Sequence, residues 1–186
     1  MTALLRTSLS LMTCVPLLAC SSLTGKEKPL VATAEIRPTT AAISSRVQPT
    51  GAVRMTQLTG SKMLVEAEIR GLRPFAEHGF NIQATADCST DPARPGAHFN
   101  PDGNPHNHPD QLIRHAGAMR NLRADSEGVA RVREQIDIVT LAPGRYGIDG
   151  LAIVVHRDPD DYVSQPVGNA GPRIGCGVVR VAPAAA

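Results

Sequence analysis

The strongest constraint on the fold is a series of short runs in which apolar and polar residues alternate, separated by Gly, Pro, Asp and Asn. In segment 63–70, the apolar residues at alternating positions fall on one face of a strand, and the charged residues fall on the other. Similar runs occupy residues 31–36, 52–58, 80–84, 129–132, 136–141, 151–156 and 177–181. About eight strands at this spacing predict an all-β fold, an antiparallel sandwich or barrel.

The composition agrees with one domain built from many short strands and turns. Aromatic residues make up 3% of the 186 residues, Trp is absent, and the chain has 16 Gly and 15 Pro. The 19 basic and 17 acidic residues are spread along the sequence and give a net charge of +2. No basic stripe favours nucleic acid as a partner.

The first 19 residues have the pattern of a signal peptide. A single Arg at position 6 precedes an apolar run over 9–18, which is too short to span a bilayer. The run ends in Leu-Leu-Ala followed by Cys20, which resembles a bacterial lipobox, where the Cys thiol is lipidated and becomes the first residue of the mature protein. The alternative is an ordinary cleavage site beside an incidental cysteine.

A polar stretch follows, so we expect a lipidated Cys20 and linker over 20–29 and one folded domain over 30–186. Ser21 lacks the Asp that retains lipoproteins in the inner membrane. We therefore expect an anchor in the bacterial outer membrane, with the domain facing the periplasm. The membrane is the expected partner through this anchor, and no motif identifies a protein partner.

The remaining cysteines predict one disulfide. Cys14 leaves with the signal peptide and Cys20 is lipidated, so only Cys88 and Cys176 belong to the folded domain. An oxidising compartment favours a bridge between them, which would stabilise the fold by on the order of 4 kcal/mol because it closes a long loop. A pair of free thiols is the alternative.

Two long segments, 87–121 and 157–174, are rich in Pro, Gly, Asn and Asp and lack strand patterns. Long loops on a rigid β scaffold usually carry function. Five of the six histidines lie in or just before the first segment, and His156 ends the strand that leads into the second. This distribution predicts a metal site between the two loops.

Five motifs occur in the order and with the spacing of a known family: 96–101 (Gly-Ala-His-Phe-Asn-Pro), His106, 114–117, 154–161 and 168–177. Together with 78–80 they cover most of the chain from residue 30, and they resemble the copper/zinc superoxide dismutases. The resemblance implies an eight-stranded Greek-key β-barrel with a metal site between two long loops. It also implies a disulfide between Cys88 and Cys176.

The resemblance assigns zinc to three histidines. His98, His106 and His115 match the metal-bridging histidine and the two further zinc histidines of the family. Ala118 stands where the family has its zinc Asp, and Asp125 is the nearest acid downstream. We expect zinc on the three histidines, with the fourth position left to water or a carboxylate. The alternative is that these histidines are remnants of a lost site.

The copper side departs further from the family, whose strand supplies two histidines at positions i and i+2. Asn81 and Gln83 occupy these positions here, which leaves His98 and His156 as the matching copper ligands. Because neutral amides are poor copper ligands, we expect zinc rather than copper as the cofactor. His108, in an exposed turn, is a weak candidate for a substitute ligand, and a buried His78 is a weaker one.

Two supporting residues persist. Arg173 matches the arginine that guides and binds superoxide in the family, although it could instead bind loop backbone near the disulfide. Asp160 matches the carboxylate that links a zinc histidine, here His106, to a copper histidine, here Asn81. An Asn side chain could still donate to that carboxylate.

Three functions follow. We favour a superoxide dismutase-like envelope lipoprotein that retains zinc and has little or no dismutase activity. The second is a working superoxide dismutase with a modified copper site. The third is a zinc hydrolase that uses the open three-histidine centre, for which the sequence offers no general base or substrate pocket.

Overall fold

The computed structural model describes residues 28–89 and 96–183. The predicted signal peptide over 1–19, Cys20 and most of the 20–29 linker lie outside the described residues. Among the described residues, no helix has the length and apolar character needed to cross a membrane.

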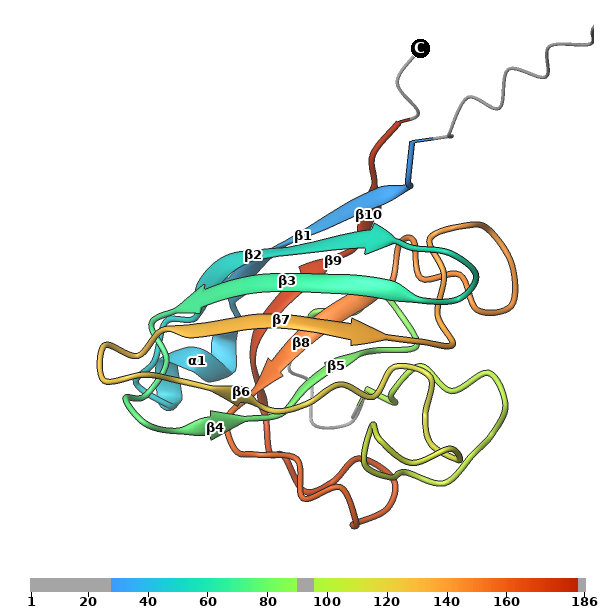
Figure 1. Cartoon of the computed structure of the whole chain (residues 1–186). Helices are drawn as coiled ribbons and strands as arrows, with labels where there is room; N and C mark the ends of the chain where they lie inside the picture. Colours follow the sequence, from blue (N-terminus) through green and yellow to red (C-terminus); the bar gives the residue numbers. More distant parts are fainter. Residues whose placement is uncertain (1–27, 90–95, 184–186) are drawn as a thin grey trace, which may run out of the picture.

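The regular secondary structure of the described chain is almost entirely β-strand, which confirms the predicted fold class (Figure 1). Seven strands hydrogen-bond in the order β5-β8-β9-β1-β2-β3-β7, and β10 pairs with β1 to complete an eight-stranded antiparallel sheet that curls on itself. The bounds are β1 Val31–Pro38, β2 Thr50–Gln57, β3 Met63–Arg70, β5 Phe80–Ile82, β7 Ala130–Ile136, β8 Ala152–His156, β9 Arg173–Val178 and β10 Arg180–Val181. Outside this sheet, β4 (Glu77–His78) pairs with β6 (Leu122–Arg123), and α1 spans Thr40–Ser44.

The apolar core lies inside the curled sheet. Alternation along β3 buries the side chains of one face completely or almost completely, as the sequence pattern predicts. On β5, Phe80 and Ile82 face this core and pack with Ile153 and Val155 of β8. The intervening residues of β5 and β8 must therefore face the opposite side of the sheet.

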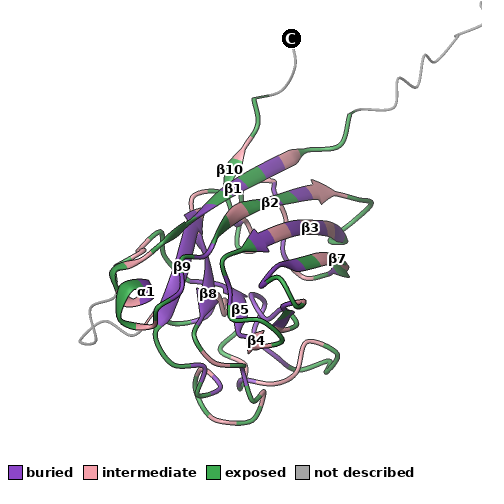
Figure 2. Cartoon of the chain, turned by 90° about the vertical axis from the view of Figure 1, so that its left-hand side faces the viewer, coloured by how far each residue is buried: buried purple, intermediate pink, exposed green. Residues whose placement is uncertain are grey.

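That opposite side is also buried, because the two long loops cover it. Strands β8 and β9 are buried along nearly their whole length in Figure 2. Both loops lie on the same side of the molecule, below β5 and β8 in Figure 1. A polar site can thus form between the sheet and the loops, outside the apolar core.

The disulfide between Cys88 and Cys176 is present, with Cα atoms 5.6 Å apart. It fastens the start of the first long loop to β9. Cys176 packs with Ala152 and Val154 of β8 in a small apolar cluster on the loop side of the sheet. The predicted bridge is confirmed, and it holds the loop against the face that carries the site.

One predicted strand, 136–141, is wrong. Strand β7 ends at Ile136, and Ile138 has a φ of 71°, in the left-handed region. This conformation interrupts an extended chain, and the N–H of Val139 bonds instead to the carbonyl of Asp137. Most apolar residues of this segment are buried, but they reach the core from a bend and not from an extended strand.

Candidate metal centre

The loop-facing side of β5 and β8 presents polar side chains to the long loops. Asn81 pairs with Val154 in the register of β5 and β8, so the alternating residues Asn81, Gln83 and His156 share one face. Asn81 is 0%, Gln83 1% and His156 7% exposed. We call Asn81, Gln83 and His156 the amide half of the site.

Three histidines of the first long loop converge beside this face. His98, His106 and His115 are each 5% exposed or less, and their ring centroids lie 5.1 to 5.4 Å apart. One ligand atom from each lies within 4.8 Å of the others. We call these three residues the histidine cluster, which the sequence predicted and the fold brings together.

The nitrogen atoms of the cluster fit a tetrahedral zinc ion. The Nδ1 atoms of His98 and His115 lie 3.4 Å apart, close to the edge of about 3.3 Å expected for two nitrogens bound to one zinc. The Nδ1 atom of His106 is buried and has no hydrogen-bond partner among the described residues. A bound cation would give this atom the partner that the protein does not supply.

Burial keeps His98 and His115 in the form that binds metal. Desolvation, aided by the neighbouring histidines, lowers the pKa of His98 to about 2. Burial also lowers the pKa of His115. Neutral imidazole is the ligand form of histidine, so His98 and His115 need no deprotonation near neutral pH to accept a cation.

Asp160 orients His106 within the cluster. The Asp160 carboxylate accepts hydrogen bonds from Nε2 of His106, at 2.8 Å, and from the backbone N–H of Tyr162, at 2.7 Å. When Nε2 carries the proton, Nδ1 presents its lone pair to the cluster. Gly168 makes room for this contact, since a Cβ there would overlap Asp160 and lie 2.8 Å from His106 Nε2.

Two further supports of the cluster were not predicted. Gln165 accepts from the backbone N–H of His106 and donates to its carbonyl, both at 2.8 Å. Asn121 exchanges two 3.0 Å hydrogen bonds with the backbone of Asp160. These residues lie tens of positions from their partners, so no local sequence signal marks them.

The amide half has no comparable network. Both amide atoms of Asn81, both of Gln83, and Nε2 of His156 are buried without hydrogen-bond partners in the described chain. Nε2 of His98 is in the same situation and belongs to the histidine cluster. The expected donation from Asn81 to Asp160 is therefore not made, and that prediction is wrong. The Asn81 side chain is shorter than the family's histidine, and its amide makes no hydrogen bond within the described chain. Asp160 instead accepts hydrogen bonds from His106 and from the backbone N–H of Tyr162.

His156 retains the orientation of a ligand. Its Nδ1 bonds to the carbonyl of Gly171 at 2.9 Å, which leaves the buried Nε2 as an unshared acceptor. The donors of this half are thus one imidazole nitrogen and two amides, together with Nε2 of His98. This set does not fit copper that must cycle between oxidation states, because such sites rely on imidazole and sulfur ligands.

Arg173 lies beside the amide half. It is 7% exposed, and its Nη1 donates to the carbonyl of Asp87 at 3.0 Å, one residue before the disulfide. A Cβ on Gly96 would overlap Oε1 of Gln83 and lie 2.8 Å from Nη1 of Arg173. The guanidinium therefore bonds loop backbone and also borders Gln83.

The other candidate ligands lie elsewhere. His78 is fully buried, and its Nδ1 bonds to the carbonyl of His156 at 2.9 Å. His108 packs its ring on Tyr162, with centroids 4.4 Å apart. Asp125 accepts from the N–H of Val129 at 2.9 Å in a turn. Within the described residues, none of these three joins the histidine cluster.

Comparison with known proteins places this geometry in a family. The family model described as copper/zinc superoxide dismutase matches residues 49–179, which include the whole site. The chain belongs to the copper/zinc superoxide dismutase family.

Individual relatives of the chain support the same assignment. The chain is 39% identical to a Cu-Zn superoxide dismutase of Paramecium bursaria Chlorella virus 1 over 138 residues, which cover 71% of this chain and 73% of the relative. It is also 39% identical to Cu-Zn superoxide dismutase 2 of Aquifex aeolicus over 127 residues, 66% and 74% of the two chains. The crystal structure of the clock protein EA4 superposes with a TM-score of 0.71 at 33% identity, covering 85% of this chain and 98% of that one.

Proposed function

We propose that this chain is a superoxide dismutase-like lipoprotein of the bacterial envelope that binds zinc and has little or no dismutase activity. The observation that supports the proposal most strongly is the pair of buried, unpartnered amides, Asn81 and Gln83, on the loop-facing side of β5. They stand where the family has two imidazole ligands. Zinc binding rests on the convergence of one ligand atom from each of His98, His106 and His115, with the Nδ1 atoms of His98 and His115 3.4 Å apart.

Ligand chemistry explains why zinc binding and the loss of copper chemistry are proposed together. Zinc supplies a fixed positive charge and no redox change, and three neutral imidazoles suffice to hold it with a fourth ligand from outside. Dismutation requires copper to gain and lose an electron, and replacing two imidazoles by amides weakens copper binding and shifts its potential. In this chain Asp160 holds His106 toward the cluster, while no such contact orients Asn81.

A second candidate is a working dismutase with a modified copper site. Two observations favour it. The Nε2 atoms of His98 and His156 are both buried and unpartnered, as two remaining copper ligands would be. Arg173, which the family uses to guide superoxide, borders Gln83.

Metal analysis and an activity assay on one preparation separate the two candidates. The domain over residues 30–186 would be purified, loaded with zinc and copper, and dialysed. We expect close to one zinc and far less than one copper for each chain, and superoxide removal no faster than that of the zinc-loaded protein. Stoichiometric copper with robust copper-dependent turnover would establish the second candidate.

The proposed location has its own test. We propose that Cys20 carries the lipid and that the domain faces the periplasm from the outer membrane. Expression of the full chain in a Gram-negative host with radiolabelled palmitate should label the wild-type protein and place it in the outer-membrane fraction. Cys20→Ser should abolish the label and release the protein, whereas labelling of Cys20→Ser would contradict the proposal.

A further inference from the structure

The three histidines of the cluster differ in what holds their main chain. His98 lies beside β5, since the N–H of the next residue, Phe99, donates to the carbonyl of Ile82 at 2.8 Å. His115 is joined to the same segment, because the N–H of Gly117 donates to the carbonyl of Phe99, also at 2.8 Å. Both histidines are therefore positioned by β5 and by the first long loop itself.

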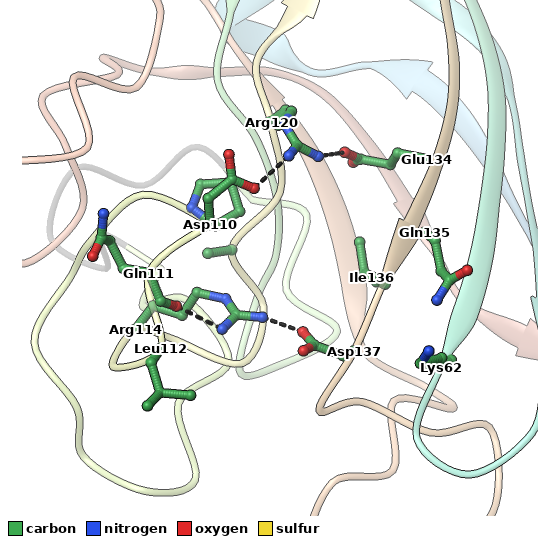
Figure 3. A pocket seen from close by; sticks show the side chains of 12 residues that line it. Lys62, Asp110, Gln111, Leu112, Arg114, Arg120, Glu134, Gln135, Ile136 and Asp137 are labelled. Atoms are coloured by element: carbon green, nitrogen blue, oxygen red, sulfur yellow. Dashed lines mark hydrogen bonds and ion pairs between the residues drawn. The ribbon is translucent and has the colours of Figure 1, made fainter.

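Ion pairs fasten the end of the first long loop to β7 and to the bend that follows it (Figure 3). Arg114 pairs with Asp137, and Arg120 pairs with Glu134 at 3.2 Å. Both pairs lie at a cavity of about 370 Å³ between the loop and β7, which Ala118 also lines. This part of the loop is attached directly to the barrel.

His106 lies between these attached parts and depends on the second long loop. The Gln165 side chain accepts from the main-chain N–H of His106 and donates to its carbonyl, both at 2.8 Å. Within the described residues, His106 has no other main-chain hydrogen bond. Asp160, from the same loop, accepts from the ring Nε2 at 2.8 Å. One loop thus fixes both the main chain and the ring of this histidine.

The two supporting residues, Asp160 and Gln165, are the ends of a turn that Asp161 closes. Oδ1 of Asp161 accepts from the main-chain N–H groups of Val163 and Ser164, at 2.9 and 2.8 Å, and Oδ2 accepts from the Ser164 hydroxyl at 2.6 Å. The hydrogen bonds from Ser164 and Val163 lower the pKa of Asp161 to about 2, so its carboxylate is ionised near neutral pH. Asp161 and Gln165 are themselves exposed to solvent.

We propose that Gln165 and Asp161 are positioning residues of the zinc site. Gln165 holds the main chain of His106, and Asp161 acts through Gln165 by closing the turn. The second long loop thereby sets how tightly zinc is held and how long it is retained. The inference rests on the proposed zinc site, and neither residue supplies a ligand atom to the histidine cluster.

Gln165→Met tests the contact with His106, because it keeps a side chain of similar length and removes both hydrogen bonds. The domain over residues 30–186, which contains every described strand, would be loaded with zinc and mixed with excess chelating dye. We expect zinc affinity to fall by about 10- to 100-fold, with faster zinc release, because the ligand is no longer oriented before the metal binds.

Gln111→Met is the matched control, since Gln111 is exposed on the first long loop and its side chain has no hydrogen bond among the described residues. It should release zinc at the wild-type rate. The cobalt-loaded proteins give a second readout: the visible absorption of Co²⁺ should change in Gln165→Met, where His106 is free to reorient, and stay constant in Gln111→Met.

Asp161→Asn and Asp161→Ala separate the turn from the charge. Both remove the same negative charge, but Asn keeps an oxygen that can accept from the two main-chain N–H groups. We expect Asp161→Asn to release zinc at close to the wild-type rate and Asp161→Ala to release it about tenfold faster. Equal rates in the two variants would overturn the role of Asp161.

The outcomes also separate this inference from the proposed zinc site. Failure of the wild-type protein to bind zinc or cobalt overturns the zinc site and the positioning role together. Zinc that binds to the wild-type protein and leaves Gln165→Met at the same rate overturns only the positioning role. A Gln165→Met protein that is less stable in urea but keeps the wild-type release rate and cobalt spectrum does so too, because Gln165 would then be merely structural.

Discussion

The histidine cluster and the amide half of the site lie against each other under the same loops and are almost equally buried, yet they differ in how their polar atoms are satisfied. His106 is held by Asp160 and by Gln165, which leaves one nitrogen free to bind a cation. Asn81 and Gln83 have no partner for either amide atom in the described structure. Both halves are thus buried, but hydrogen bonds orient His106 in the histidine cluster and leave the two amides without a described partner, and on this difference rests our proposal that the cluster is the half that binds metal.

The largest expected effect is loss of zinc from the histidine cluster. His106→Ala removes one of the three histidine donors, so we expect zinc affinity to fall by roughly 1,000-fold. Competition with a chelating dye measures the affinity. His108→Ala is the matched control, because this neighbouring histidine packs on Tyr162 outside the cluster. Equal losses in both variants would contradict the assignment of ligands.

Replacing the two amides, Asn81 and Gln83, by histidines should have the next largest effect. Asn81→His with Gln83→His restores the donor type of the family on the shared face of β5, so copper-dependent superoxide removal should rise at least about 100-fold. Gln48→His with Gln135→His adds two histidines at exposed positions and should leave the rate unchanged. A wild-type rate already equal to that of the restored variant would reverse the ranking of the two proposed functions.

Acid should destabilise the zinc-free protein through its buried histidines, since the amides of Asn81 and Gln83 do not titrate. The pKa of His98 is lowered from 6.5 to about 2, so between these values the unfolded chain binds a proton that the folded chain does not. Stability is therefore constant well above pH 6.5 and falls as the pH drops through 6.5 and below. From His98 alone we expect the free energy of unfolding to fall by about 1.4 kcal/mol between pH 7.5 and 5.5.

Urea unfolding at the two pH values measures this change. His156 and His78, whose pKa values are also lowered by burial, should add to the loss in the same direction. An unfolding midpoint that does not move between pH 7.5 and 5.5 would show that the buried histidines take up protons without unfolding.

The smallest effect concerns the unpartnered amides. Replacing Asn81 by Leu, which has nearly the same shape, removes two buried polar atoms that lack partners, so the zinc-free protein should become more stable by about 1 kcal/mol. Asp160→Leu should act in the opposite direction, because His106 and Tyr162 lose their acceptor. Thermal unfolding of both variants measures the contrast, and destabilisation by Asn81→Leu would indicate that its amide makes a bond in solution.

Much of the fold could be predicted from the sequence, and the errors have local causes. The strand over 63–70 was predicted with its bounds because one face packs on the core and the other meets solvent. The prediction of a strand over 136–141 was wrong because Ile138 has a left-handed backbone conformation that bends the chain. Its neighbours are buried in the core all the same, which produced the misleading pattern. Alternation of apolar residues reports which side chains are buried, and it reports extended backbone only when no bend intervenes.

The sequence by itself determined the types of donor: three histidines with family spacing, two amides at i and i+2, an Ala at position 118 and a pair of cysteines. These follow from residue identity and from resemblance, which need no coordinates. Only the tertiary structure decided that Asp160 satisfies His106 and not Asn81, that Gln165 supports the cluster from the other loop, and that Ala118 borders a cavity. Such contacts join residues far apart in the chain, and hydrogen bonds depend on distances of a few tenths of an ångström that only the packed fold fixes.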